Sequence, residues 1–328
     1  MLAEWLELPG AAERIAAWSE ISGLDLAQLG TTATAEEITD TAVTQPLVVA
    51  ATLLAYEELI KREILSSIPG PVEIVAAGHS VGEIAAYAIA GVISADEAVS
   101  LAATRGAEMA KACAVEPTGM SALLGGDEDE VLARLEALDL VPANRNADGQ
   151  IVAAGAVSAL EKLAEDPPAR ARVRRLATAG AFHTQYMASA LEGYANVAGR
   201  IAPSEISSPI SGTTITLLSN ADGKPVSSAA DAMTKLVAQM TKPVRWDLCT
   251  ATMRDRFDHD GTTAALVEFP PAGTLTGIAK RELRGVPTHA IKSPADLDGL
   301  VESLHVCPGE HAYPTDPSVP PAATPPEQ

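Results

Sequence analysis

Residues 78–82 read G-H-S-V-G and place Ser80 between two glycines, directly after an apolar, β-branched run at 72–78. Residues 81–90 then have the composition of a buried helix that ends at the following glycine. A strand, a tight turn that carries a serine and a helix together form a nucleophile elbow. Its glycines permit the turn, and the helix N-terminus favours the negative charge that develops during attack. This context favours a nucleophilic serine over the alternative, a serine in a purely structural turn.

A serine nucleophile needs a base, and the chain offers six histidines. Four of them are poorly placed. His79 is the neighbour of Ser80, and His259 lies in a charged stretch. His305 and His311 lie in or beside the proline-rich end of the chain. His183 and His289 remain. His183 follows a predicted strand, where loops often carry chemistry, so it is the preferred candidate.

The composition limits the kinds of partner. The chain has 328 residues, of which 47% are hydrophobic and 20% charged, as is ordinary for a globular protein. Its formal net charge of -20 argues against binding to nucleic acid, which requires cations that neutralise phosphates. An acidic protein partner would need a local basic patch.

Four arginines supply such a patch in an otherwise acidic sequence: Arg170, Arg172, Arg174 and Arg175. On a strand, the first three would share one face. They could dock an acidic protein partner, or they could form a solvated edge that discourages aggregation.

Cysteine usage and the N-terminus indicate the compartment. Cys113, Cys249 and Cys307 are far apart and match no metal-ligand spacing, so we expect a reduced cytoplasmic setting without a bound metal. The first residues lack the basic region and the apolar run of a signal peptide. The apolar run at 44–60 is broken by charge before it reaches membrane length. We therefore predict a soluble protein without a membrane partner.

The order of apolar patterns predicts an α/β protein. Long helices are expected over residues 44–65 and 94–113, the second with Ser94 as its N-cap. Strands at 119–126, 149–156 and 173–180 then alternate with helices at 127–138 and 157–166. This βαββαβ-like alternation predicts a small inserted unit at 118–178 within a larger α/β body, residues 1–117 and 179–304. Residues 305–328 are rich in proline and are predicted to be a disordered tail.

Six motifs follow one another along the chain: G-H-S-V-G-E (78–83), T-R-G-A-E-M (104–109), N-R-N-A-D-G-Q-I-V-A-A-G (144–155), G-A-F-H-T-Q-Y-M (180–187), K-P-V-R-W (242–246) and P-P-A-G-T-L-T-G-I-A-K-R (270–281). Together they resemble the malonyl-CoA:acyl carrier protein transacylase family, from residue 1 to about 300. The resemblance implies a hydrolase-like parallel-sheet core, with a small ferredoxin-like α+β subdomain inserted over the site.

The resemblance also implies catalytic roles. Ser80 would accept the acyl group, His183 would be the general base, and the main-chain carbonyl at Gln239 would orient the histidine in place of a carboxylate. The backbone N–H of Val81 would be one oxyanion donor.

Substrate selection would depend on Arg105, which would hold the free carboxylate of the malonyl group. A guanidinium pairs with a carboxylate through two hydrogen bonds and stays charged inside a site. The alternative is a helix-surface arginine paired with Glu108. Four further residues would line the site: Gln45, Asn144, Asn146 and Phe182, the last in the A-F-H form that resembles malonyl-selecting members.

The implied reaction moves malonyl from malonyl-CoA to the phosphopantetheine thiol of acyl carrier protein through a malonyl-serine, in fatty-acid or polyketide synthesis. A monomer without a cofactor is expected. One rival is a serine thioesterase or hydrolase of acyl-CoA, and another is a catalytically impaired binding relative.

One departure from the family concerns the N-terminus. Family members begin with a strand and a G-Q-G loop whose glutamine is the second oxyanion donor, whereas M-L-A-E-W-L-E-L resembles the segment just after that loop. We expect this strand and loop to be lacking. Either the start codon was assigned too far downstream, or the protein lacks the strand.

Overall fold

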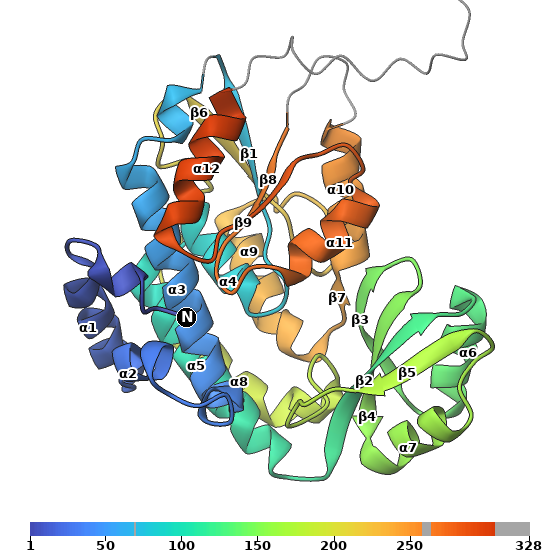
Figure 1. The fold of residues 1–328 in the computed structure, drawn as a ribbon. Coiled ribbons are helices and arrows are strands. Elements are labelled where there is room, and N and C mark those ends of the chain that lie inside the picture. Colours follow the sequence, from blue (N-terminus) through green and yellow to red (C-terminus); the bar gives the residue numbers. More distant parts are fainter. Residues whose placement is uncertain (69, 258–263, 306–328) are drawn as a thin grey trace, which may run out of the picture.

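Two long helices, α3 (Thr41–Lys61) and α5 (Ala95–Cys113), pack against each other at the centre of the large subdomain (Figure 1). α5 begins at the predicted N-cap, where the Ser94 hydroxyl accepts from the Glu97 N–H and the Glu97 carboxylate accepts from the Ser94 N–H. This reciprocal pair satisfies two N–H groups that a helix start leaves open. α3 starts at Thr41 rather than 44, so Pro46 lies inside the helix.

The computed structural model describes residues 1–68, 70–257 and 264–305. Eight further helices belong to the large subdomain: α1 (Ala11–Ser22), α2 (Leu26–Thr31), α4 (Gly82–Ile89), α8 (Leu191–Ala198), α9 (Ala229–Ala238), α10 (Trp246–Phe257), α11 (Thr274–Glu282) and α12 (Pro294–His305). Short 3-10 helices are η1 (Trp5–Glu7), η2 (Glu37–Thr39), η3 (Leu65–Ser67), η4 (Gln185–Ala190) and η5 (Gln239–Thr241). The tail predicted at 305–328 lies, beyond His305, outside the described residues.

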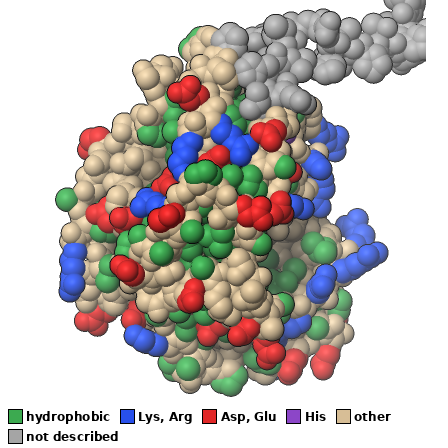
Figure 2. Space-filling view, turned by 60° about the vertical axis from the view of Figure 1, so that its left-hand side comes forward, with side chains coloured by type: hydrophobic (Ala, Val, Ile, Leu, Met, Phe, Trp, Pro, Cys, Tyr) green, Lys and Arg blue, Asp and Glu red, His purple; other side chains and the backbone are tan. Residues whose placement is uncertain are grey.

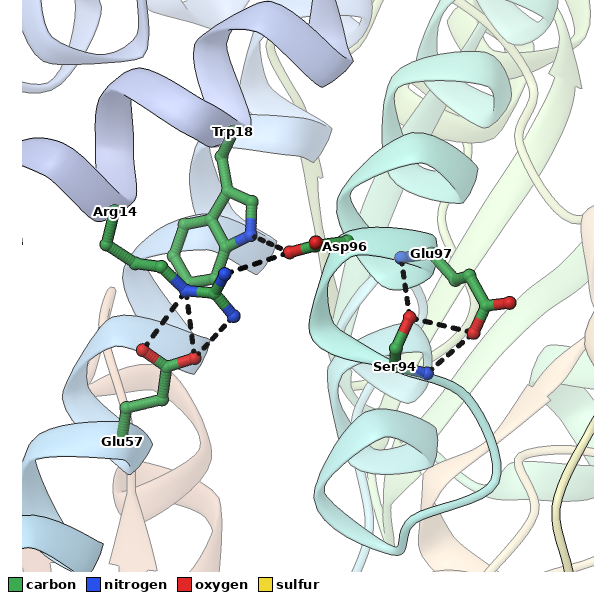
Figure 3. A network of polar contacts seen from close by, with 6 residues as sticks. All are labelled: Arg14, Trp18, Glu57, Ser94, Asp96 and Glu97. Atoms are coloured by element: carbon green, nitrogen blue, oxygen red, sulfur yellow. Dashed lines mark hydrogen bonds and ion pairs between the residues drawn. The ribbon is translucent and has the colours of Figure 1, made fainter.

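A polar network ties α1 to both central helices (Figure 3). The Arg14 guanidinium stacks on the Trp18 ring, forms three hydrogen bonds with the Glu57 carboxylate of α3, and donates to Asp96 of α5. The Trp18 indole N–H donates to the same Asp96 carboxylate at 2.9 Å. Planar pairing of this kind fixes geometry as well as charge, so α1 is held in one orientation.

The parallel strands of the large subdomain form two pairs. β1 (Val72–Ala76) pairs with β6 (Thr213–Leu217), and β8 (Leu266–Glu268) pairs with β9 (Thr288–Ala290). Helices cover these strands on both sides in Figure 1. The predicted hydrolase-like parallel core is therefore confirmed, although its described strands form two pairs and not one continuous sheet.

The small subdomain has the predicted βαββαβ order: β2 (Thr118–Gly125), α6 (Glu128–Ala137), β3 (Val141–Ala147), β4 (Gln150–Ala156), α7 (Val157–Glu165) and β5 (Ala171–Arg175). The antiparallel order β5-β2-β4-β3 is that of a ferredoxin-like sheet. β7 (Val244–Arg245) of the large subdomain joins β3 in parallel. This added strand binds the two subdomains together.

The structure differs from two sequence expectations in this unit. β3 was not singled out as a strand, because Pro142, Asn144 and Asn146 make it polar where strands are usually apolar. β5 ends at Arg175 instead of residue 180, and Arg170 precedes it in a left-handed turn with φ 62°. Arg170 is therefore not part of the strand.

The apolar segment that contains α3 is also longer than expected. The segment 41–67 has the length and hydropathy of a helix that could cross a membrane, contrary to the expectation that charges break the apolar run too early. In the structure, however, α3 packs on α5 and buries side chains along its whole length, among them Leu47, Leu54 and Leu59. This is the burial of a core helix.

Candidate active site

Ser80 lies in a strained turn between β1 and α4. Its φ of 53° is left-handed, a conformation that costs energy for any residue except glycine. The Asn220 side chain holds the turn on both sides. Its Oδ1 accepts from the Ser80 N–H at 2.8 Å, and its Nδ2 donates to the Gly78 carbonyl at 2.8 Å. The chain therefore keeps the serine in a conformation that it would not otherwise favour.

The two glycines of the turn are not equivalent. A Cβ on Gly78 would lie 2.0 Å from the Gly82 carbonyl oxygen, so no other residue fits at position 78. A Cβ on Gly82 would meet no atom within 4 Å, and its φ is not left-handed. The close approach of the chain therefore requires a glycine at position 78, whereas space alone does not require one at position 82.

Ser80 and His183, distant in sequence, meet in the structure. The Ser80 Oγ lies 2.7 Å from His183 Nε2, and His183 Nδ1 lies 2.8 Å from the Gln239 carbonyl oxygen. A carbonyl can only accept, so Nδ1 carries the proton and Nε2 presents its lone pair to the serine hydroxyl. Burial, and secondarily the Arg105 charge, lower the pKa of His183 to about 3. The imidazole is thus neutral at physiological pH, as a base must be.

Arg105 is buried beside Ser80 and is not a surface arginine. It is 1% exposed, and its Nη2 lies 3.5 Å from the Ser80 Oγ. Nη1 donates to the Gln45 side-chain oxygen at 2.6 Å, and Nη2 donates to the Gln239 side-chain oxygen at 2.7 Å. Two neutral amides thus orient a guanidinium without neutralising it. Its Nε has no partner in the described structure. The site can therefore attract an acyl group that carries an anion.

Glu83, which sequence reasoning missed as a site residue, lies buried beneath Ser80. Its carboxylate accepts from the Asn220 N–H at 2.7 Å and from the Gln239 side-chain amide. That amide also donates to the Ser80 carbonyl at 2.9 Å. Glu83 therefore fixes the orientation of Gln239, which in turn contacts Arg105. The available signal was a single carboxylate in an otherwise apolar helix.

We expect Glu83→Gln to change the pH profile of Ser80 acylation. Burial raises the pKa of Glu83 to about 7. Protonation then removes an acceptor that Gln239 needs, so the wild-type acylation rate should fall as the pH drops from 8 to 6. Because the pKa of His183 is about 3, this fall should not come from the histidine. The variant should be slower at pH 8 and lack the fall. It should also lose roughly 1–3 kcal/mol of unfolding free energy, since it leaves a buried donor unpaired.

Single-turnover acylation at pH 6–9 measures this effect, with the unfolding free energy followed by denaturant titration. An acidic limb that persists unchanged in Glu83→Gln would assign the titration to another group.

Of the four residues predicted to line the site, one contacts Arg105 and the other three make different contacts. Gln45 contacts Arg105 directly. Asn146 forms a hydrogen bond with His79, whose ring packs on Trp246. Asn144 is buried on β3 but makes no hydrogen bond to Ser80, His183 or Arg105 in the described structure. Phe182 is half-buried between core clusters of both subdomains.

The backbone N–H of Val81 meets no acceptor within the described part of the chain. Val81 follows the nucleophile and precedes the first residue of α4, so its N–H lies at a helix N-terminus. An N–H in this position can donate to a developing oxyanion. Among the described residues, no group of three or more His, Cys, Asp and Glu side chains could hold a metal ion.

Comparison with known proteins agrees with this geometry. The model of the acyl transferase domain family matches residues 11–298. A malonyl CoA-acyl carrier protein transacylase of Mycolicibacterium smegmatis is 77% identical over 300 residues, which cover 92% of this chain and 99% of that protein. A protein of the same name from Mycobacterium tuberculosis is 69% identical, with coverage of 92% and 94%.

Solved structures show the same likeness. The crystal structure of MCAT from Mycobacterium tuberculosis has a TM-score of 0.84 at 69% identity and covers 92% of this chain and 94% of that one. A type II polyketide-synthase acyl-carrier protein in complex with its malonyl-transacylase includes a chain with a TM-score of 0.80 at 27% identity, again with coverage of 92% and 94%. The chain therefore belongs to the acyl transferase domain family, in the group of the malonyl CoA-acyl carrier protein transacylases.

Proposed function

We propose that this protein transfers the malonyl group from malonyl-CoA to the phosphopantetheine thiol of an acyl carrier protein, in the cytoplasm and as a monomer. The observation that carries the proposal is the buried Arg105 guanidinium, 3.5 Å from the Ser80 hydroxyl that His183 contacts. A nucleophile beside a fixed cation suits an acyl group with a free carboxylate.

Acylation begins when Ser80 Oγ attacks the thioester carbonyl and His183 Nε2 takes the hydroxyl proton. The Val81 N–H donates to the oxyanion of the tetrahedral intermediate. The C–S bond then breaks, and His183 returns its proton to the departing CoA thiolate. Arg105 holds the malonyl carboxylate throughout these steps.

Transfer reverses these events with a different thiol. His183 takes the proton of the carrier's phosphopantetheine thiol, whose sulfur attacks the serine ester. The C–O bond breaks and Ser80 recovers its proton from His183. The two half-reactions share one covalent intermediate, so ping-pong kinetics are expected.

Radiolabelled malonyl-CoA tests the function. Wild-type protein should retain label, Ser80→Ala should retain none, and holo carrier protein should remove the label as malonyl-carrier. Apo carrier protein, which lacks the thiol, is the matched control. Rapid release of free malonate without carrier would indicate a thioesterase, and absence of label would indicate a binding protein.

We also propose that the sheet of the large subdomain has room for one further strand, such as the strand with a G-Q-G loop that the family resemblance implies. Two observations support this. In the described residues, β1 pairs only with β6 and β8 only with β9. Val75 of β1 and Leu266 of β8 nevertheless pack in one apolar cluster. A strand between these pairs would complete one sheet, and its loop would add an oxyanion donor.

A chain extended by that strand and loop should therefore melt at a higher temperature and acylate Ser80 about a hundred- to a thousand-fold faster. Equal melting temperatures and rates for both forms would show that the sheet needs no further strand.

A further inference from the structure

We propose that the outer edge of the small subdomain docks the acidic carrier protein. This docking edge consists of the exposed side chains Arg172 and Arg174 on β5 and Leu124 on the neighbouring β2. The proposal rests on the proposed function and names the surface by which the second substrate arrives.

The docking edge lies on the face of the sheet that is turned toward the active site. Val173 packs into the apolar cluster beneath α6 and α7, so its neighbours Arg172 and Arg174 lie on the opposite face. That opposite face carries Met120 and Val152, which belong to the cluster that contains Phe182, the residue before His183.

A row of cross-strand partners connects the docking edge to the site. Arg174 lies opposite Ala122, Ala122 opposite Val152, and Val152 opposite Asn144. Three strand spacings make this row about 14 Å long. Asn144 lies two residues before Asn146, which bonds to His79, the neighbour of Ser80. A carrier bound at the edge would therefore present its flexible arm from the same side of the sheet that borders the site, over the side chains that cover the buried Val152 and Asn144.

The two arginines of the docking edge form no ion pair within the described part of the chain. Arg172 and Arg174 are exposed and have no carboxylate within ion-pair distance among the described residues. Arg14, Arg134 and Arg145, in contrast, are each paired with an acid. Figure 2 shows Asp and Glu side chains interspersed with Lys and Arg on the side on which α1 lies in Figure 1. In a chain of net charge -20, an unpaired basic edge is a surface that an acidic partner can meet favourably.

The edge also offers an apolar contact. Leu124 is 42% exposed and lies directly opposite Arg172. An exposed apolar side chain flanked by cations fits a partner that presents acids around an apolar spot. β5 is the last strand of its sheet, so no neighbouring strand covers this surface in the described structure.

Charge reversal tests the proposal in the intact protein. In Arg172→Glu/Arg174→Glu, the KM for holo carrier protein should rise at least about tenfold at low salt. The KM for malonyl-CoA and the rate of malonyl transfer to free pantetheine should stay within about twofold, because neither uses the edge. Raising the salt toward 1 M should shrink the difference, since screening shortens the Debye length from about 10 to 3 Å. Arg172→Ala/Arg174→Ala should give a smaller rise.

The matched control is Lys61→Glu/Arg200→Glu, which reverses two exposed cations of the large subdomain. It should leave both KM values unchanged. Equal carrier KM values in the two double variants would overturn the proposal and leave the arginines the role of preventing strand pairing at the edge. Failure of the wild type to transfer malonyl to the carrier would overturn the proposed function and this proposal with it.

Discussion

Arg105→Ala should lower kcat/KM for malonyl transfer by roughly a hundred- to ten-thousand-fold. Losing a buried, charge-assisted pair costs about 3–5 kcal/mol, and each 1.36 kcal/mol is a factor of ten. Transfer of an uncharged acetyl group should be spared or improved, because acetyl has no carboxylate to pair. The measurement compares acylation of Ser80 by malonyl-CoA and by acetyl-CoA in both proteins.

Arg105→Lys is the matched control. It keeps the charge but loses the planar fork that donates to Gln45 and Gln239 at once. It should recover part of the malonyl activity without gaining acetyl activity. An equal loss for malonyl and acetyl in Arg105→Ala would instead show that the arginine only supports the shape of the site.

His183→Ala should slow malonyl and acetyl transfer alike, by about a hundred- to ten-thousand-fold. The base acts on the serine proton whatever acyl group is attacked, so the ratio between the two substrates should not change. This result distinguishes His183 from Arg105, whose loss should alter the ratio. Single-turnover acylation with both substrates measures it.

His79→Gln is the control for this prediction. His79 is the neighbour of Ser80 but bonds to Asn146, and glutamine can keep a hydrogen bond there. Its rate should fall far less than that of His183→Ala. Comparable losses in the two variants would show that the assignment of the base to His183 is wrong.

The base illustrates where reasoning from sequence stops. Elimination left His183 and His289, and only the structure shows that His183 lies 2.7 Å from Ser80 while His289 belongs to β9. Nothing local to either histidine decides this. The choice depends on how η4 and η5 pack at the active site, which brings the Gln239 carbonyl onto the ring.

Glu83 and Asn220 illustrate the same limit. Glu83 was within a quoted motif, but its hydrogen bonds to the Asn220 N–H and the Gln239 amide join three distant segments. β3 was missed because its side chains are polar, and it is a strand through pairing with β4 and β7. The β-propensity of a segment predicts a strand poorly where neighbouring strands supply the contacts that stabilise it.

By itself, the sequence determined the features that neighbouring residues control. These include the elbow at Ser80, the capped start of α5 at Ser94, and the succession of β2, α6, β4 and α7 in the small subdomain. A tight turn, a helix N-cap and a hydrophobic period each depend on residues close together in the sequence, so they can be predicted from a short segment of it. The tertiary structure alone decided which histidine reaches Ser80, that Arg105 is buried beside it, and that Arg172 and Arg174 remain unpaired on an edge. These features depend on contacts between segments far apart in the chain, and packing of the whole core selects them.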